Sequence, residues 1–106
     1  MPPVLQISFH NSEPIDDVQT RVRQELAELE KFENRIMSCN VNIYLPEHPH
    51  RASVSKVQID FGLRGSVETK TEPQHLEVKA QHKNAEMAVH GAFNKARRYL
   101  SDCKGR

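Results

Sequence analysis

The stretch LEVKAQHKNAEMAVHGAFNKARRYL, residues 76–100, changes from the periodicity of a β-strand to that of an α-helix. Leu76, Val78 and Ala80 alternate with polar residues, which is the period of a half-buried strand. Asn84 is a good cap for the helix that follows. Small and apolar residues then recur every three or four positions and predict its inward side: Ala85, Ala88, Val89, Ala92, Phe93, Ala96, Leu100 and Cys103. We therefore predict a strand followed by a helix that packs closely through alanines.

The beginning of the chain contains a second strand and helix pair. Residues 4–10 alternate between apolar and polar side chains and predict a strand. Residues 11–14, Asn-Ser-Glu-Pro, predict a helix start, because Ser or Asn can cap free amides and Pro is tolerated in the first turn. Apolar residues then recur at helical spacing: Ile15, Val18, Val22, Leu26, Leu29 and Phe32. We expect this helix to stop near Asn34.

Two more strands are predicted in the middle of the chain. Residues 38–45 alternate so that Cys39, Val41, Ile43 and Leu45 would face the core. A polar turn over residues 47–51 follows, and residues 56–61 alternate again before Gly62 and Gly65 close that strand. We expect residues 63–75 to form a mobile loop, in which residues 67–71 could extend a hairpin.

The element order is β-α-β-β-β-α, and residues 1–106 fit one domain. This order predicts an α+β sandwich, with a four-stranded, mainly antiparallel sheet and both helices packed on one face. The other face should meet water, because the residues predicted there are polar: Gln6, Ser8, Asn40, Asn42, Tyr44, Lys56, Gln58, Glu77 and Lys79.

Composition favours a cytoplasmic protein that does not enter a membrane. Hydrophobic residues make up 37% and charged residues 27% of the chain, and no apolar run approaches the roughly 20 residues of a membrane span. The residues before the first strand lack the basic and apolar regions of a secretory signal, so we expect a protein that is not secreted. In a reducing compartment, Cys39 and Cys103 are expected to be buried free thiols.

The net charge of +1 conceals an uneven distribution. Residues 13–34 contain seven acidic and three basic residues, which gives −4, whereas residues 79–106 contain seven basic and two acidic residues, which gives +5. A molecule of this kind can present a basic face to a polyanion and still stay soluble.

The sequence contains no motif of an enzyme or of a cofactor site. The phosphate-binding loop, the dinucleotide fingerprint, the nucleophile elbow and the zinc-protease motif are all missing. His48 and His50 supply too few ligands for a metal. Asp16 and Asp17 fall in a first helical turn, where the helix dipole favours acidic residues, so a catalytic role is not needed to explain them. We therefore expect no catalysis, no metal and no cofactor.

Basic residues in and before the last helix are candidates for contact with RNA phosphates: Lys79, Lys83, His90, Lys95, Arg97 and Arg98. His90 and His82 could each touch a phosphate or form a local cap, and the local role is favoured for His82. Aromatic residues make up only 6%, and Tyr44 and Tyr99 do not form an evident stacking platform. This favours recognition of the RNA backbone or shape over base stacking.

Three segments carry a family resemblance: residues 25–32, Glu-Leu-Ala-Glu-Leu-Glu-Lys-Phe, then Arg35-Ile36 leading into a strand, and residues 76–81 leading into the alanine-rich helix. In pattern and spacing the chain resembles the ribosome hibernation-promoting factor and ribosome-associated inhibitor family, also called sigma-factor modulation proteins. The resemblance implies a domain that lodges between head and body of the small ribosomal subunit, binds its rRNA in the mRNA–tRNA channel and blocks translation in starved cells.

The resemblance also implies site residues. Lys95 and Arg98 fall on commonly basic positions of the last helix, Arg35 falls on the basic position after the first helix, and Arg51 lies at the hairpin tip. They are followed by four further candidates: Lys79, Lys83, Arg97 and His90. The implied protein is a short form without a C-terminal domain, and we expect a monomer that binds neither DNA nor membranes.

A different class of function remains open at this stage. Glu25 and Glu28 occupy positions where this family often has lysine, and carboxylates facing RNA would repel phosphate. The alternative is a diverged member of the same fold that binds a protein through its acidic first helix and does not bind ribosomes. The direction in which Glu25 and Glu28 face bears on this choice.

Overall fold

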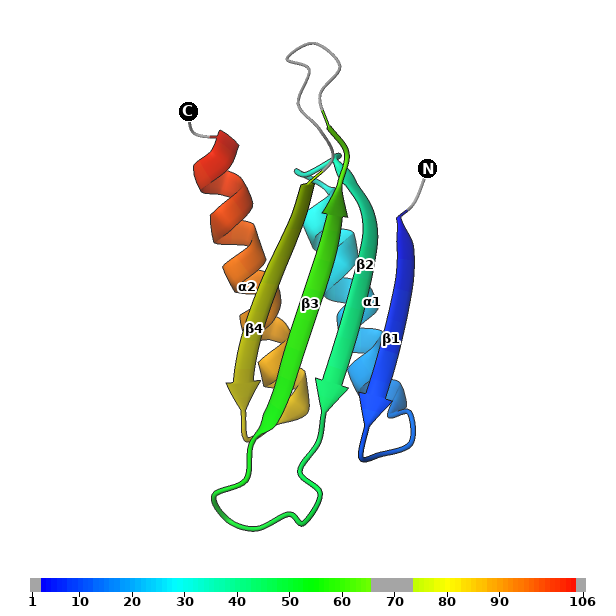
Figure 1. Cartoon of the computed structure of the whole chain (residues 1–106), viewed down its shortest axis with the longest axis vertical. Coiled ribbons are helices and arrows are strands. Elements are labelled where there is room, and N and C mark those ends of the chain that lie inside the picture. Colours follow the sequence, from blue (N-terminus) through cyan, green and yellow to red (C-terminus); the bar gives the residue numbers. More distant parts are fainter. Residues whose placement is uncertain (1–2, 66–73, 105–106) are drawn as a thin grey trace.

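The computed structural model describes residues 3–65 and 74–104, with side chains described up to residue 101. The elements follow the predicted order: β1 (Val4–His10), α1 (Asp16–Glu30), β2 (Ile36–Tyr44), β3 (Ser55–Leu63), β4 (Gln74–His82) and α2 (Ala85–Lys104). The strands lie in one sheet in the order β1-β2-β3-β4 (Figure 1). β1 pairs with β2 in parallel, and the other two pairs are antiparallel. The predicted fold class is confirmed.

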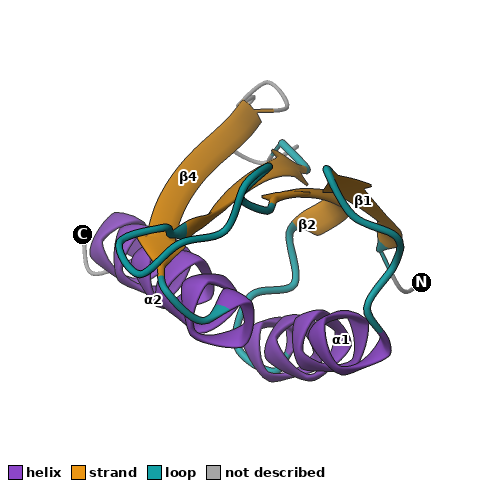
Figure 2. Cartoon of the chain, turned by 90° about the horizontal axis from the view of Figure 1, so that it is seen from below, coloured by secondary structure: helices purple, strands orange, loops and turns teal. Residues whose placement is uncertain are grey.

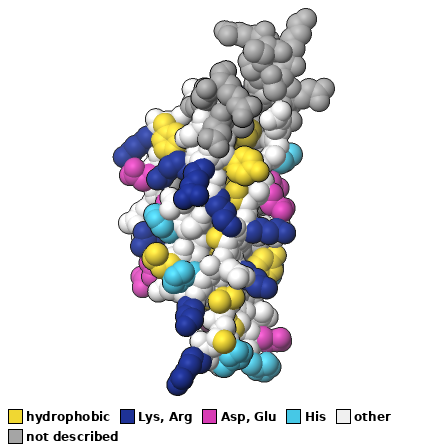
Figure 3. Space-filling model, turned by 90° about the vertical axis from the view of Figure 1, so that its left-hand side faces the viewer, with side chains coloured by type: hydrophobic (Ala, Val, Ile, Leu, Met, Phe, Trp, Pro, Cys, Tyr) yellow, Lys and Arg dark blue, Asp and Glu magenta, His cyan; other side chains and the backbone are white. Residues whose placement is uncertain are grey.

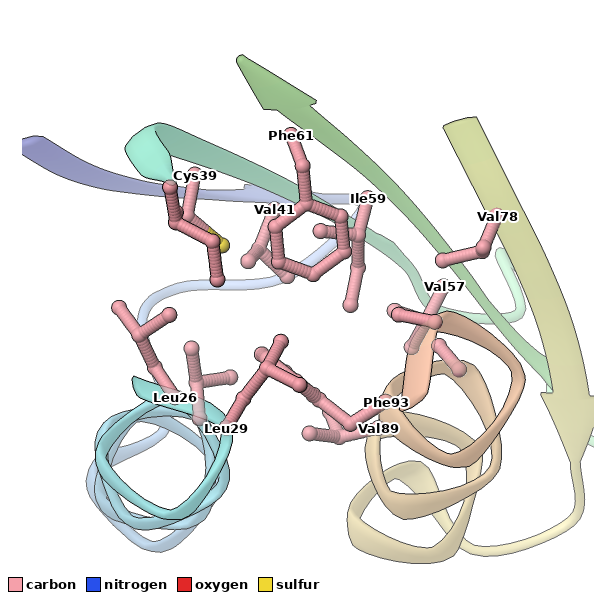
Figure 4. Close-up of a cluster of buried hydrophobic side chains, with 14 of the residues drawn as sticks. Leu26, Leu29, Cys39, Val41, Val57, Ile59, Phe61, Val78, Val89 and Phe93 are labelled. Atoms are coloured by element: carbon pink, nitrogen blue, oxygen red, sulfur yellow. The ribbon is translucent and has the colours of Figure 1, made fainter. Parts of the chain in front are cut away.

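Both helices cover the same face of the sheet (Figure 2). The core lies between them and the sheet, and its largest fully buried side chains include Phe61, Phe93, Leu29, Ile43 and Ile59. The rings of Phe61 and Phe93 meet edge to face with centroids 5.8 Å apart (Figure 4). On α2, the alanines at 88, 92 and 96 are at most 1% exposed, so small side chains let this helix approach its neighbours closely.

The predicted alternation of strand residues is largely confirmed. Cys39, Val41 and Ile43 of β2 are buried, whereas Leu45 lies just beyond β2 and is partly buried. The alternation over residues 56–61 predicts that Val57, Ile59 and Phe61 face the core, and all three are buried. Gly62 does not close β3 but lies within it, opposite Ser38. A Cβ at Gly62 would collide with the Ser38 hydroxyl, which explains the absence of a side chain there.

The start of α1 differs from the prediction. The helix begins at Asp16 and its N-cap is Ile15, without a side-chain cap. Asn11 instead adopts a φ of 68° and its amide donates a hydrogen bond to the Leu45 carbonyl, 3.1 Å away. Its side chain thus ties the end of β1 to the end of β2. Phe32, predicted inside the helix, lies after it and is 40% exposed, and Asn34 also lies past the helix end at Glu30.

The cap of α2 agrees with the prediction. The Asn84 side-chain oxygen accepts hydrogen bonds from the backbone N–H groups of Glu86 and Met87, at 2.8 and 3.2 Å. Such a cap satisfies amides that have no partner inside the helix.

The loop predicted over residues 63–75 is shorter at both ends, because Leu63 pairs with Gln74 and Gly62 pairs with His75. Residues 66–73 lie outside the described residues, and so does the hairpin extension predicted over residues 67–71.

The predicted polar residues alternate along the strands with the residues that face the core, so they lie on the face of the sheet away from the helices, and each of them is exposed or half-buried. The strand register arranges them in rows across the sheet. One row contains Tyr44, Lys56 and Gln81, the next contains Asn42, Gln58 and Lys79, and a third contains Asn40, Asp60 and Glu77.

Candidate RNA interface

Lys79, Lys95 and Arg98 form what we call the β4–α2 strip. Lys95 and Arg98 are three residues apart on α2 and therefore share a face of the helix. The Lys95 ammonium donates a hydrogen bond to the Lys79 carbonyl, 2.5 Å away. All three side chains are exposed, and they line one shallow depression together with Glu77, Val78 and Tyr99. Figure 3 shows Lys and Arg side chains gathered along this side of the molecule.

The position of Lys95 depends on β4 being an edge strand. A strand at an edge has main-chain groups without a strand partner, and Lys95 satisfies one such carbonyl. The one carboxylate that pairs with the strip among the described residues is Glu77, whose oxygen lies 3.7 Å from the Lys79 nitrogen. Both side chains are well exposed, so this ion pair contributes little and leaves Lys79 available to another anion.

Lys83 and Arg51 lie at the end of the sheet where β2 and β4 terminate. Lys83 is in the connection from β4 to α2, and Arg51 is in the connection from β2 to β3. Both are exposed, and both connections lie at the same end of the molecule (Figure 1). They can extend the strip toward this end.

Arg97 and His90 face a different direction, toward α1. The Arg97 guanidinium lies over the Phe32 ring, 5.7 Å from its centroid, and its Nε is buried without a hydrogen-bond partner among the residues that the structure describes. His90 Nδ1 is 2.8 Å from the Glu25 carboxylate, and its Nε2 is 3.1 Å from the Asn94 amide. These two predicted RNA contacts are therefore engaged in packing between the helices, on another side of α2 from Lys95 and Arg98.

Arg35 lies immediately before β2, at the end of the sheet opposite the connection that contains Arg51 (Figure 1). Its guanidinium makes two hydrogen bonds to Glu33, at 2.9 and 3.2 Å, and its backbone N–H donates a third at 3.0 Å. The Glu33 side chain is fully buried. Arg35 thus compensates a buried carboxylate, and the structure does not bring it together with the strip.

The two acidic positions of α1 have different surroundings. Glu25 is buried between the helices, where it meets His90 and lies 3.6 Å from the Arg21 guanidinium. Glu28 is exposed and pairs with Lys31 at 3.1 Å. The carboxylate of Glu25 is therefore compensated inside the protein, and only Glu28 is presented to solvent.

Cys39 is a buried free thiol. Burial raises the pKa of the Cys39 thiol to about 12, with smaller contributions from Asp60 and Glu30, so the reactive thiolate is scarce at neutral pH. In residues 3–65 and 74–104, no three His, Cys, Asp or Glu side chains are placed to hold a metal ion. Across the same residues neither helix has the length and apolar character needed to span a bilayer.

Comparison with known proteins places the chain in a family. The model of the Sigma 54 modulation protein / S30EA ribosomal protein family matches residues 5–106. A search of curated protein sequences found no significant match.

Two solved structures have the same fold. The N-terminal domain of Protein Y from Thermus thermophilus superposes with a TM-score of 0.71 at 15% identity, over 92% of this chain and 94% of that one. A ribosomal subunit interface protein from Coxiella burnetii superposes with a TM-score of 0.75 at 13% identity, over 96% of this chain and 98% of that one. Because the family model covers nearly the whole sequence, this chain belongs to the Sigma 54 modulation protein / S30EA ribosomal protein family.

Proposed function

We propose that this protein is a ribosome-associated hibernation factor that binds small-subunit rRNA in the mRNA–tRNA channel and thereby inhibits translation in starved cells. Family membership supports association with the ribosome. The cytoplasm is then its place of action, and we infer a single-domain monomer that uses no membrane, DNA, cofactor or enzymatic activity.

The observation that carries the RNA-binding part of the proposal is the β4–α2 strip. Its three cations are exposed, share one side of the molecule and have a single weak carboxylate neighbour among the described residues. Three phosphate contacts give a slope of about −2 to −3 in a plot of log affinity against log salt concentration. Lys83 and Arg51 would add to this slope, so binding should weaken steeply as salt rises.

The surroundings of Glu25 weaken one objection to this proposal. A carboxylate facing rRNA would repel phosphate, but Glu25 is buried against His90 and Arg21. The same burial removes one acidic group from the surface that the alternative, a protein-binding acidic helix, would use. We therefore prefer RNA binding.

The test is cosedimentation of the purified protein with isolated small ribosomal subunits at low salt. Changing Lys95→Glu and Arg98→Glu together should abolish cosedimentation, because the strip becomes acidic. A control with the same change in net charge, Arg23→Glu on α1 and Lys31→Glu at its C-terminal cap, should retain most of it. All four side chains are exposed, so each variant should fold, and thermal unfolding checks this.

Unchanged cosedimentation of the Lys95→Glu, Arg98→Glu variant would reject the strip. Equal loss in both variants would show that net charge, and not this surface, governs binding. Failure of the unmodified protein to sediment with small subunits would overturn the proposed function itself and favour a protein-binding role.

A further inference from the structure

A groove lies on the outer face of the sheet, next to the β4–α2 strip. Six of its lining residues carry the argument, and we call this surface the sheet-face groove: Tyr44, Lys56, Gln58, Lys79, Gln81 and Lys95. Lys79 and Lys95 line both the groove and the strip. An anion bound along the strip can therefore continue onto the sheet.

Tyr44, which lines this groove, belongs to an aromatic pair. The rings of His10 and Tyr44 are stacked, with centroids 4.3 Å apart and planes 13° apart. His10 Nε2 lies 3.1 Å from the Asn42 side-chain oxygen, and this contact fixes the imidazole ring. His10 is on β1, on one side of Tyr44, whereas Lys56 of β3 and the groove are on the other side. Tyr44 thus has one ring face supported by His10 and the other turned toward the groove.

The groove is basic along its length. Lys56 lies between Tyr44 and Gln81 in the cross-strand row, and among the described residues no carboxylate pairs with it. The nearest acidic row is two rows away and contains Asp60 and Glu77.

Both of those carboxylates already have partners. Glu77 accepts a hydrogen bond from Gln58 at 2.8 Å and pairs with Lys79, and Asp60 lies 3.5 Å from the His75 ring. Among the described residues, neither carboxylate therefore pairs with Lys56 or Lys95.

We propose that the sheet-face groove binds an unpaired RNA strand, with a base stacked on Tyr44 and backbone phosphates on Lys56, Lys79 and Lys95. Each part of such a strand has a counterpart here: a supported ring for a base, cations for phosphates, and the Gln58 and Gln81 amides for base edges. An acidic peptide would satisfy the lysines but would leave the supported ring without a partner. The inference deepens the proposed function, since it names the kind of RNA that the strip would lead onto this face.

The experiment measures binding of the full chain to two labelled probes by fluorescence anisotropy. One probe is a 12-nucleotide oligouridine, and the other is an abasic chain with the same number of phosphates. We expect the oligouridine to bind more tightly. Tyr44→Ala should weaken oligouridine binding about tenfold and leave the abasic probe unaffected, because stacking of one base is worth about a factor of ten. Tyr44→Phe keeps the ring and should retain binding.

A charge change tests the phosphate contact separately. Lys56→Gln should weaken binding of both probes and reduce the slope of log affinity against log salt by about 0.7, the value for one phosphate of a single strand. Lys31→Gln is the matched control, because Lys31 is exposed on the helix side of the molecule and changes charge equally. It should leave both the affinity and the slope nearly unchanged.

The outcomes separate this inference from the proposed function. Equal affinity of unmodified protein for the two probes, or an unchanged oligouridine affinity in Tyr44→Ala, would overturn the groove as a binding site for bases. Either result is compatible with normal cosedimentation with small subunits, which would leave the proposed function in place. Both proposals are supported if the Lys95→Glu, Arg98→Glu variant no longer cosediments with small subunits and Tyr44→Ala binds oligouridine more weakly than the unmodified protein.

Discussion

Replacing Glu25 with alanine should destabilise the protein, whereas the same change at Glu28 should not. Glu25 is 7% exposed and its carboxylate lies 2.8 Å from His90 Nδ1 and 3.6 Å from the Arg21 guanidinium. Among the described residues, the charged partner of Glu28 is the exposed Lys31 side chain, 3.1 Å away. The two positions are on the same helix, so the helix propensity changes equally in both variants.

The magnitude follows from these surroundings. A hydrogen bond to a charged group contributes about 1.5–3 kcal/mol when buried. The His90 side chain is 39% exposed, so solvent screening reduces the contribution, and we expect a loss of about 1–2 kcal/mol for Glu25→Ala. In a domain of this size that loss lowers the melting temperature by about 5–15 °C. Glu28→Ala should stay within about 0.5 kcal/mol of the unmodified protein.

Urea unfolding followed by circular dichroism measures both variants, and a double-mutant cycle with His90→Ala isolates the pair. We expect a coupling free energy of about 0.5–1.5 kcal/mol between Glu25 and His90, because the two side chains are in contact. Equal unfolding midpoints for Glu25→Ala and Glu28→Ala, or a cycle without coupling, would refute the claim that this carboxylate is used to join the helices.

Three other predictions concern the core and α2. Phe93→Ala should lower the free energy of unfolding by about 3–5 kcal/mol, because removal of a ring that is 1% exposed leaves a cavity. Met87 is exposed, so Met87→Ala should change the free energy of unfolding by less than about 0.5 kcal/mol. Urea unfolding measures both variants. Gly91→Ala should raise the free energy of unfolding by about 0.5–1 kcal/mol in the same assay, since the added Cβ would make only an ordinary 3.6 Å contact inside a helix, and a destabilised variant would contradict this. In a Cys103→Ser background, Cys39 should resist a thiol reagent at pH 8 until urea unfolds the chain. Rapid labelling of the folded protein would contradict the burial of this thiol. Because the pKa of Cys39 in the folded protein is raised from 9.0 to about 12, the contribution of the neutral thiol to stability should be complete below pH 9 and should be lost as the pH rises through 12.

The sequence alone was sufficient to predict the helices and strands and the buried side of each. Strands repeat every two residues and helices every 3.6, so local patterns already separate Val41 from Asn42 and Phe93 from Asn94. The Asn84 cap was also predictable, because its partners lie two and three residues away. The cap of α1 was not, because Asn11 bonds to a residue 34 positions further along the chain.

The division of the basic residues among different surfaces depended on the tertiary structure. In the sequence, Lys95, Arg97 and Arg98 form one basic cluster. In the structure, α2 packs against β4 on one side and against α1 on another, so Arg97 lies over Phe32 whereas Lys95 and Arg98 stay exposed.

Contacts between distant positions were likewise hidden from the sequence. Glu25 meets His90 across 65 positions, and the stacking of His10 on Tyr44 requires the parallel register of β1 and β2. Tyr44 on its own gave no sign of a platform for a base, because its supporting ring comes from another strand. Local spacing determines which face of an element a side chain occupies. The residues that it contacts on that face come from distant segments of the chain, and only the tertiary structure shows which segments pack together.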